Sequence, residues 1–597
     1  MTTAPLKLYR RTGEVIPYLE SEVEEFERQV EGLGAGEIDP LAFQAFRLRQ
    51  GVYGQRQPDV QMIRVKIPGG MLTARQLDAL GEIAARFAPL RKGHVTTREN
   101  VQYHHVRLED AATVLRVLGK AGLTSREACG NTVRNVITCP LAGVCRDEAF
   151  DVTPYLGAYA RWFVRQPLTQ SLPRKVKTAF SPCARDCAVT AMHDIGFIAQ
   201  TRVEGGQVRK GFRIVVGGGT SIMPKLAQTV VEFAPVEEFL RYCEAILRIF
   251  NRSDELRRNR MMARIKVLIH RIGIEKFREL VQEELKQPWA EASFDPTPLL
   301  YFDPAETEPR PSRNGHDPQP PAPEPAFQRW LSSNVVPQRQ EGFCAAHVTL
   351  PLGDVTDRQF HALATLARRC ANGRARVSAE QNLVLRWVRE EALYGLWRGL
   401  REIGLGDAGA QEITDVTSCP GTDSCKLGIT ASMGLGRAIQ DGLATEDLAD
   451  PLVRQMHIKI SGCPNGCGRH HVANIGFHGA SYKGDGVHPV PAYEVFLGGN
   501  FELENGPVRY ADRVPGRVPA KLAPEAVHRI LDRYRRERQE SEPFNDYVLR
   551  VGAKSFEPLL AGLKDVAPLS DESQDVYMDW ERASLYEVQR GEGECAV

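Results

Sequence analysis

The sequence lacks the features that mark several classes of protein. None of its apolar runs approaches the ~20 residues that span a bilayer, and its first residues contain no apolar segment typical of a secretory signal. Lys and Arg total 76 against 75 Asp and Glu, so the formal charge of +1 gives no global attraction to nucleic acid or to anionic membranes. We therefore expect a cytoplasmic protein that binds neither nucleic acid nor membrane.

The sequence also has no evident nucleotide-binding loop. Gly217, Gly218 and Gly219 do not form the Gly-x-Gly-x-x-Gly loop that opens a helix after a strand in flavin and nicotinamide sites. Any redox chemistry would therefore draw its electrons from an external donor. With 597 residues, 42% hydrophobic and 25% charged, the chain has the composition of a folded globular protein. Its length predicts about two to four domains.

Cysteine, by contrast, is abundant. The chain holds 13 cysteines, and without a signal segment metal or redox chemistry explains them better than disulfides do. Eight of them form two sets, and each member of the second set lies 280 residues after its counterpart in the first. The first set is Cys139, Cys145, Cys183 and Cys187, and the second is Cys419, Cys425, Cys463 and Cys467.

The matched spacing extends beyond cysteine. His193-Asp-Ile-Gly-Phe corresponds to Ala473-Asn-Ile-Gly-Phe, and Arg98-Glu-Asn-Val corresponds, at a slightly larger offset, to Glu380-Gln-Asn-Leu. The chain is therefore a tandem duplication of one large unit, and we expect pseudo-twofold symmetry with a site where the copies meet. The predicted fold class is α+β, with a small α/β half-domain and a larger mixed-sheet domain in each copy.

The domain boundaries follow from the repeat and from composition. Residues 301–328 are rich in proline and predict a polar, extended linker, and residues 561–597 form an acidic tail. The remaining segments are an N-terminal extension (1–50), the half-domain (51–122) and cysteine domain (123–300) of the first copy, and the half-domain (329–406) and cysteine domain (407–560) of the second.

Periodicity predicts the elements of both copies. Strands are expected at 60–67, 94–97, 101–106 and 212–216, and at 345–350, 375–378, 383–388 and 494–497. Helices are expected at 73–87, 111–121 and 236–250, and at 356–369, 391–403 and 524–537.

The spacing alone leaves several uses of four cysteines open. Structural zinc sites favour short Cys-x2–4-Cys pairs, which Cys419-x5-Cys425 does not match. An iron–sulfur cubane takes four thiolates from separated loops, and the Gly and Pro residues around Cys463 and Cys467 would let backbone N–H groups approach its sulfides. Buried cysteines also serve as small apolar side chains. The matched spacing disfavours that use and favours a cluster over zinc.

The motifs resemble one family over most of the chain. Cys419-x5-Cys425 with Ser461-Gly-Cys-Pro-Asn-Gly-Cys467-Gly-Arg-His resembles the signature of the sirohaem-dependent sulfite and nitrite reductases. The resemblance runs from about Tyr53 to Arg550 and includes the duplicated architecture. Its other motifs are Arg64-Val-Lys-Ile-Pro-Gly-Gly, Thr96-Thr-Arg-Glu-Asn, Val133-Arg-Asn-Val and Leu172-Pro-Arg-Lys-Val-Lys.

This resemblance implies two coupled cofactors. A [4Fe–4S] cluster would be held by Cys419, Cys425, Cys463 and Cys467, and the Cys467 thiolate would also bind the iron of sirohaem. On the opposite haem face, basic side chains would capture the oxyanion and deliver protons. The matching residues are Arg64, Arg134, Lys175 and Lys177, with Asn465 at a further position near the haem.

Weaker matches concern the carboxylates of sirohaem. The resemblance suggests that four basic residues bind these groups and that a glycine run brings backbone amides close to them. These residues are Arg98, Arg174, Arg264 and Lys266, and Gly217, Gly218 and Gly219. In the second copy the substrate cations Arg64, Arg134, Lys175 and Lys177 are replaced by His347, Thr414, Gln455 and His457. We therefore expect one catalytic centre, between the copies.

The implied activity is multi-electron reduction of sulfite to sulfide in assimilatory sulfur metabolism. Nitrite reduction to ammonia is the alternative within the family, and a non-enzymatic iron–sulfur electron carrier is the alternative outside it. Lys175 and Lys177 favour sulfite, because two ammonium groups suit an anion that can carry two charges. Nitrite-specialised members tend to have Lys-x-Asn at these positions. The external donor would be a ferredoxin or a flavoprotein subunit.

The first cysteine set departs from many family members, which lack it. It holds either a second [4Fe–4S] cluster or an empty remnant of the duplication. The loop residues Pro464-Asn-Gly have become Ala184-Arg-Asp, which removes the Pro and Gly that ease close backbone approach. No second set of cations exists, so a second catalytic haem is not expected.

Three further residues complete the predictions. In some family members a Tyr and a Cys near the haem are joined as a thioether, and Tyr53 and Cys129 match those positions. A core role for both residues is the alternative. We expect no catalytic role for Cys595 in the tail.

Overall fold

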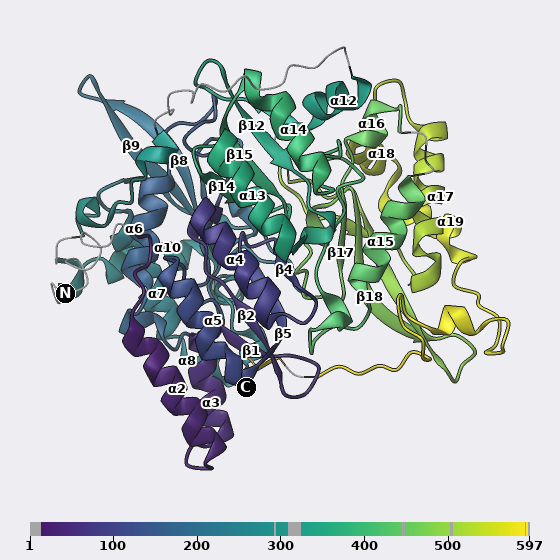
Figure 1. The fold of residues 1–597 in the computed structure, drawn as a ribbon, viewed down its shortest axis with the longest axis horizontal. Coiled ribbons are helices and arrows are strands. Elements are labelled where there is room, and N and C mark those ends of the chain that lie inside the picture. Colours follow the sequence, from purple (N-terminus) through teal and green to yellow (C-terminus); the bar gives the residue numbers. More distant parts are fainter. Residues whose placement is uncertain are drawn as a thin grey trace.

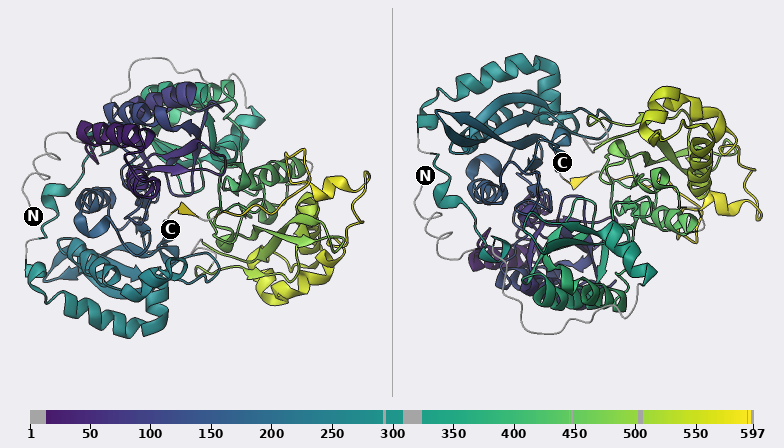
Figure 2. Two further views of the ribbon diagram at one scale, coloured as in Figure 1. Left: turned by 90° about the horizontal axis from the view of Figure 1, so that it is seen from below. Right: turned by 90° about the horizontal axis from the view of Figure 1, so that it is seen from above.

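The computed structural model describes residues 14–291, 294–307, 324–444, 446, 448–501, 506–591 and 593–594. It forms three lobes (Figures 1 and 2). The two half-domains, purple and green, make one lobe, and the cysteine domains of the first copy (blue to teal) and second copy (green to yellow) make the others. Each copy has mixed sheets covered by helices, which confirms the predicted α+β fold and its duplication.

Each half-domain contains a five-stranded antiparallel sheet. The first sheet has the order β1-β2-β5-β4-β13 and the second has the order β11-β12-β15-β14-β3. The strands of the first are β1 (Val52–Gly54), β2 (Val60–Arg64), β5 (Val101–Arg107), β4 (Lys92–Val95) and β13 (Asp354–Thr356); those of the second are β11 (Val335–Pro337), β12 (Phe343–Val348), β15 (Leu383–Arg389), β14 (Arg374–Val377) and β3 (Met71–Thr73).

The two half-domains exchange one strand each. β13 belongs to the second copy but pairs with β4 of the first, and β3 belongs to the first copy but pairs with β14 of the second. A tight turn precedes each exchanged strand, at Pro68–Gly70 and at Pro351–Gly353. Because the exchange is reciprocal, neither sheet is complete alone, and one hydrophobic core runs through both half-domains.

Two equivalent helices pack against each other over these sheets, α4 (Ala74–Phe87) and α13 (Asp357–Cys370) (Figure 1). Each begins with a capping box, made by Thr73 with Gln76 and by Thr356 with Gln359. The threonines predicted as first helical residues are therefore the caps. The remaining helices of this lobe are α5 (Leu108–Lys120), α12 (Pro325–Asn334) and α14 (Leu393–Glu402).

The two cysteine domains share one topology. In each, three parallel strands are followed by antiparallel ones, and each sheet supports a separate core. The first has β6 (Ile137–Thr138), β7 (Thr178–Ser181), β8 (Ile195–Glu204), β9 (Gln207–Val216) and β10 (Gln228–Pro235); the second has β16 (Thr417–Ser418), β17 (Ile458–Ser461), β18 (Ile475–Lys483), β19 (Pro489–Leu497), β20 (Asp512–Arg513) and β21 (Val518–Pro519).

Helices cover both sheets. The first domain has α6 (Thr153–Phe163), α7 (Phe239–Asn251), α8 (Asp254–Arg258), α9 (Ile265–Ile272) and α10 (Ile274–Glu284); the second has α15 (Ser432–Leu443), α16 (Pro451–Arg454), α17 (Ala523–Glu537), α18 (Phe544–Val551) and α19 (Glu557–Ala561).

The prediction of an extended linker is wrong at its described ends. Residues Pro304–Thr307 form the helical turn α11, and Glu306 is buried against Arg376 and Arg386 of the second half-domain. Helix α12 begins at Pro325. Buried ion pairing therefore fixes the start of the segment, and residues 308–323 lie outside the described ranges.

The N-terminal extension and the C-terminal tail meet in the structure. The N-terminal extension forms α2 (Glu20–Gly34) and α3 (Pro40–Arg49), and α2 packs against α5. The acidic tail returns to α3, where Arg47 donates two hydrogen bonds of 2.8 Å to the buried Glu594 carboxylate. Within the described ranges no helix is long and apolar enough to cross a membrane.

Candidate active site

The second cysteine set lies at the carboxyl ends of adjacent parallel strands. Cys419 follows β16 and Cys463 follows β17, so one edge of the sheet brings both pairs of cysteines together. The Gly462 N–H donates to the Cys419 thiol at 3.2 Å, and the N–H groups of Leu427 and Gly428 donate to Cys425. Such N–H···S contacts surround iron–sulfur clusters and tune their potentials.

The four thiols of this set lie within electrostatic range of one another. Burial raises the pKa of the Cys419, Cys425 and Cys463 thiols, and the nearby Cys467 raises them further. Among the described residues, no group of three His, Cys, Asp or Glu is placed to hold a single metal ion. A cubane, which needs a thiolate at each iron, matches this donor set.

Cys467 differs from the rest of its set. It is exposed, whereas Cys463 is buried and Cys419 and Cys425 are half-buried. The Thr97 hydroxyl, from the first half-domain, donates to the Cys467 carbonyl at 2.8 Å. Cys467 is therefore an exposed residue next to the first copy, and a thiolate shared with a haem iron would need such exposure.

Two of the predicted substrate cations converge on one carbonyl group. Arg64 and Arg134 both donate to the Ala128 oxygen, at 3.2 and 2.9 Å. Arg134 also donates to Gly130 O at 2.9 Å. Both guanidinium groups are half-buried, so they keep contact with the open space beside them.

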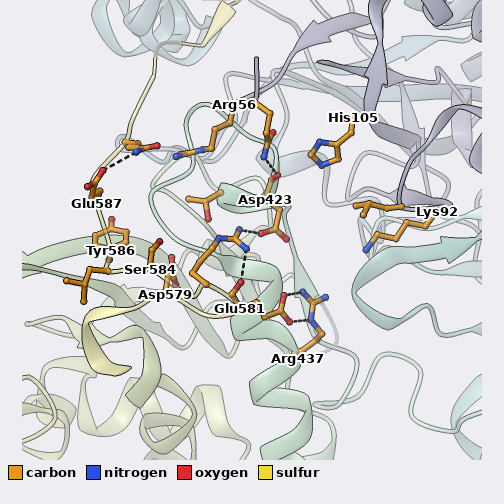
Figure 3. Close-up of a pocket in the computed structure, with 16 residues that line it drawn as sticks. Arg56, Lys92, His105, Asp423, Arg437, Asp579, Glu581, Ser584, Tyr586 and Glu587 are labelled. Carbon is orange, nitrogen blue, oxygen red and sulfur yellow. Dashed lines mark hydrogen bonds and ion pairs between the residues drawn. The ribbon is translucent and has the colours of Figure 1, made fainter. Parts of the chain in front are cut away.

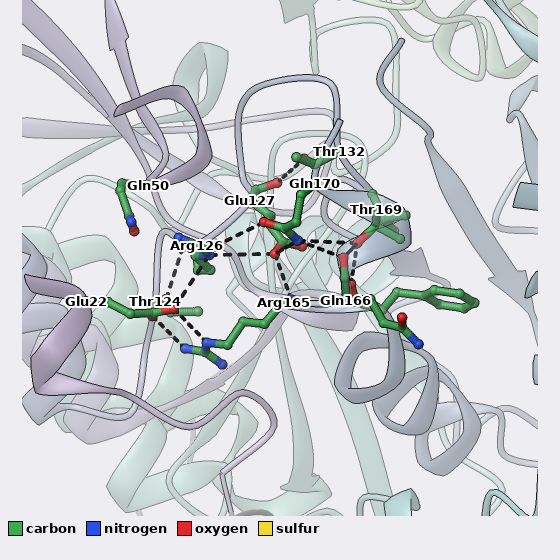
Figure 4. Close-up of polar contacts among 12 residues, drawn as sticks. Glu22, Gln50, Thr124, Arg126, Glu127, Thr132, Arg165, Gln166, Thr169 and Gln170 are labelled. Carbon is green, nitrogen blue, oxygen red and sulfur yellow. Dashed lines mark hydrogen bonds and ion pairs between the residues drawn. The ribbon is translucent and has the colours of Figure 1, made fainter. Parts of the chain in front are cut away.

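A buried polar network fixes the segment that carries Ala128 (Figure 4). Glu127 is fully buried and accepts from the Arg165 N–H at 2.7 Å and from Gln170 at 2.8 Å. Arg165 in turn donates to Glu22 of the N-terminal extension at 2.8 Å. The extension therefore helps to position the loop that orients Arg64 and Arg134, a role that the sequence did not indicate.

The predicted lysines lie on a segment next to Arg134, because the Arg134 N–H donates to Val176 O at 2.9 Å. Burial, Arg264, Lys175 and Arg98 lower the pKa of Lys177, whereas Cys467 of the second copy opposes the shift. Lys177 therefore lies in a region where charged groups of both copies interact.

Arg98 and Arg469 are buried cations behind this region. Burial and the nearby Arg469 lower the pKa of Arg98 to about 9. Arg98 donates to the Thr178 and Asn135 carbonyls, and Arg469 donates to Thr97 O at 2.7 Å. Sequence reasoning gave Arg469 no role, although its place two residues after Cys467 could have identified it.

The other predicted sirohaem partners have contacts within the protein. Arg264 pairs with both oxygens of Asp194 at 2.8 and 2.7 Å, and Arg174 lies 3.5 Å from Asn131 Oδ1. Lys266 donates to Thr220 O and Met223 O. Their roles toward sirohaem stay predictions.

The glycine run is used differently from the prediction. The Gly217 N–H donates to Asp194 O at 2.9 Å and the Gly219 N–H donates to Lys225 O at 2.8 Å. A side chain at Gly218 would meet the Ala191 carbonyl at 2.4 Å. An amide role toward the cofactor is therefore wrong for Gly217 and Gly219, because both N–H groups already have acceptors, and Gly218 permits close backbone packing.

The loop that Lys266 holds also contacts the cysteine loop. Ser221 Oγ donates to Asn465 Oδ1 at 3.4 Å, and Thr220 Oγ1 donates to Asn465 O at 3.4 Å. Asn465 is thus positioned by the first copy, next to the sulfurs of the second. Its catalytic role stays a prediction.

Tyr53 and Cys129 lie in one small apolar cluster with Leu48 and Met62. Arg64 Nη1 is 3.2 Å from the Cys129 sulfur, which places the pair beside the substrate cations. The Tyr53 hydroxyl accepts a hydrogen bond from the Glu594 N–H at 2.9 Å. The thioether stays a prediction. Cys595 lies outside the described residues.

A pocket of about 700 Å³ lies on another side of the cysteine loop (Figure 3). Its lining mixes signs: Arg56, Lys92 and Arg437 are basic, and Asp423 and Glu581 are acidic. Arg437 is paired with Glu581. None of the predicted substrate cations lines this pocket, which separates it from the haem face.

The residues present fit the implied cofactors. Several basic side chains of the first copy are half-buried here, among them Arg64, Arg134 and Lys177. Basic side chains of this kind suit an anionic ligand, and sirohaem carries many carboxylates. Four gathered thiols next to an anion-binding face define a redox protein with an iron–sulfur cluster and an anionic prosthetic group.

Comparison with known proteins identifies the family. The "Nitrite and sulphite reductase 4Fe-4S domain" matches residues 129–289 and 409–563, and the "Nitrite/Sulfite reductase ferredoxin-like half domain" matches residues 53–121 and 336–403. This chain belongs to the nitrite and sulfite reductase family and is an oxidoreductase.

Individual relatives cover most of the chain. A sulfite reductase [ferredoxin] of Mycobacterium tuberculosis (strain ATCC 25618 / H37Rv) is 31% identical over 82% of this chain and 82% of its own length. A ferredoxin–nitrite reductase of Synechococcus elongatus is 29% identical over 73% and 80%. The solved structure of the Mycobacterium tuberculosis NirA protein has a TM-score of 0.74 at 28% identity, covering 89% of this chain and 95% of that one.

Proposed function

We propose that this chain reduces sulfite to sulfide with electrons from a ferredoxin. One arrangement supports the proposal: Arg134 of the first copy lies beside the segment that carries Lys175 and Lys177, and Lys177 interacts electrostatically with the exposed Cys467 of the second copy. An electron carrier would have no use for this arrangement. The names of relatives at 31% and 29% identity support substrate and donor.

When bound, sirohaem and its cluster supply the iron that takes the oxyanion and the electrons that reduce it. The chain supplies the surrounding charge. Arg64 and Arg134, held by the Ala128 carbonyl, can each donate further hydrogen bonds to an anion's oxygens. Lys175 and Lys177 add ammonium protons for the oxygens that leave as water.

Sulfite is favoured over nitrite by the two lysines. Sulfite can carry two negative charges and nitrite carries one, so a pair of ammonium groups gains more from sulfite. Nitrite reduction to ammonia is the second candidate, supported by the similarity to the Synechococcus elongatus enzyme. The donor proposal rests on the relatives, whose names specify ferredoxin.

Steady-state turnover with each anion and each donor tests the proposal. The holoenzyme should form sulfide from sulfite with reduced ferredoxin, at a higher kcat/KM than it forms ammonia from nitrite. Nitrite turnover far above sulfite turnover would assign the second candidate. Turnover with a flavoprotein subunit but not with any ferredoxin would contradict the donor.

A further inference from the structure

The first cysteine set is also gathered in the structure. Cys183 and Cys187 have sulfurs 3.4 Å apart, and Cys187 also contacts the Cys139 thiol. Cys145 lies within electrostatic range of Cys139 and Cys183. The four thiols therefore lie near one another, at the carboxyl ends of β6 and β7.

Two backbone N–H groups contact equivalent sulfurs in both copies. The Asp147 N–H donates to Cys145, as the Leu427 N–H donates to Cys425. The Arg185 N–H donates to Cys183, as the Asn465 N–H donates to Cys463. Each donor pair keeps the 280-residue spacing. These N–H···S contacts depend on loop shape and not on side chains, so the two loops share one conformation.

The opposite half-domain holds each loop in the same way. The Arg56 N–H donates to Ser424 O at 3.0 Å, and the Arg339 N–H donates to Val144 O at 2.8 Å. The glutamine after each arginine contacts the same loop. The Gln57 side-chain amide donates to Asp423 O at 2.9 Å, and the Gln340 side-chain amide donates to Gly143 O at 3.5 Å.

The first loop keeps the backbone shape of the second despite its substitutions. Asp186 replaces Gly466 yet has the same left-handed backbone, with φ of 52° against 69°. Its buried carboxylate accepts from the Thr190 N–H at 2.9 Å and the Ala191 N–H at 3.2 Å, which compensates the loss of glycine. The lost Pro and Gly therefore do not close the site, contrary to the argument from sequence.

A strained residue follows the first loop. Val189 has φ of 50°, rare for a β-branched residue, at the position of Arg469, where φ is 63°. Strain of this kind persists where the surroundings fix the backbone. The first loop thus retains an unfavourable conformation that matches the cluster loop.

We infer that Cys139, Cys145, Cys183 and Cys187 hold a second [4Fe–4S] cluster, without a haem. Four thiolates bear a net negative charge around a cubane, and Arg185 lies near Cys145, Cys183 and Cys187 to offset it. The face opposite Cys187 lacks the substrate cations, since Gln455 and His457 replace Lys175 and Lys177. This inference goes beyond the proposed function and does not depend on the substrate.

Iron and acid-labile sulfide analysis of anaerobically purified holoenzyme tests the inference. With one sirohaem per chain and cubane stoichiometry, we expect about nine iron atoms and eight sulfides per chain. About five irons and four sulfides would overturn the second cluster. One zinc per chain together with about five irons would overturn it as well.

A matched pair of variants locates the additional iron. Cys183→Ser should lose about four irons and four sulfides and keep the haem absorbance. Cys370→Ala, which removes a buried cysteine at the end of α13 outside both sets, should keep the full count. A Cys183→Ser protein that keeps all its iron would overturn the assignment. If that variant does not fold, the iron count of the unmodified protein still decides the question.

Discussion

The two cysteine loops share a scaffold but differ in what surrounds them. The Gly462 N–H donates to the Cys419 thiol at 3.2 Å, and the Ser432 hydroxyl lies 3.6 Å from the same sulfur and donates to Cys419 O at 2.7 Å. The equivalent residues beside Cys139 are Pro182, which has no N–H, and Val152, which has no hydroxyl. The second pair of substrate cations is also missing, because Gln455 and His457 stand where the first copy has Lys175 and Lys177. After duplication, the fold preserved both loops while their surroundings gave them different roles.

Replacing the last cysteine of each loop should give the largest difference. Cys467→Ser should lose haem absorbance completely, because one sulfur would hold both the cluster and the haem iron. Cys187→Ser should lose only the irons of the first loop. Absorbance spectra and iron analysis of both variants provide the measurement. Normal haem content in Cys467→Ser would refute the shared ligand.

Replacing equivalent residues on the two faces should separate substrate binding from structure. Lys177→Asn should lower kcat/KM for sulfite at least about tenfold, or about 1.4 kcal/mol, and lower it less for nitrite. The counterpart variant, His457→Asn, should change neither value. Kinetics on preparations with equal haem content make the comparison. Equal losses on both anions would remove the argument for sulfite.

Releasing each loop from the opposite half-domain should have a smaller effect. Arg56→Ala removes side-chain contacts to Gly428 O at 2.6 Å and Cys425 O at 3.3 Å, and should speed cluster loss to a chelator about tenfold. Arg339 is half exposed and contacts Gly143 O at 3.2 Å, so Arg339→Ala should speed loss about two- to threefold. Iron release followed by absorbance measures both rates. Faster iron loss from Arg339→Ala than from Arg56→Ala would contradict the expected strengths of the two contacts.

Changing one hydrogen bond should have the smallest effect. Ser432→Val gives the second loop the residue of the first, and the loss of a donor near Cys419 should lower the reduction potential of that cluster. If this contact stabilises the reduced cluster by about 1 kcal/mol more than the oxidised cluster, its loss should lower the one-electron reduction potential by about 40 mV. A redox titration should also place the first-loop cluster below the haem-linked one. A first-loop reduction potential above that of the haem-linked cluster would contradict the argument that Pro182 and Val152 leave the first loop with fewer hydrogen-bond donors to sulfur.

Much of this arrangement was predictable from sequence. The repeat gave the two quartets and the topology, and hydrophobic periodicity located helices such as α4 and α13 to within a residue at their starts. The motif positions led to Arg64 and Arg134, which share the Ala128 carbonyl, and to Lys177, whose segment accepts a hydrogen bond from the Arg134 N–H. These features depend on local pattern or exact spacing, which a sequence displays directly.

The remaining features depend on contacts between distant segments. The exchange pairs β13 with residues 260 to 264 positions earlier and β3 with residues 301 to 305 positions later, through backbone hydrogen bonds that many sequences can make. Glu306 lies in a proline-rich stretch that looks like linker, and only its burial against Arg376 reveals its structural role. Gly217 and Gly219 looked available for a ligand because acceptors for their N–H groups cannot be read from sequence.

Mössbauer spectroscopy of the 57Fe-enriched holoenzyme tests the central claim most directly, namely that equivalent loops carry different cofactors. We expect one haem iron coupled to four cluster irons, from the second loop, and four further cluster irons with no coupling to haem, from the first. Two haem irons per chain, or cluster irons in the haem-coupled form only, would contradict the account.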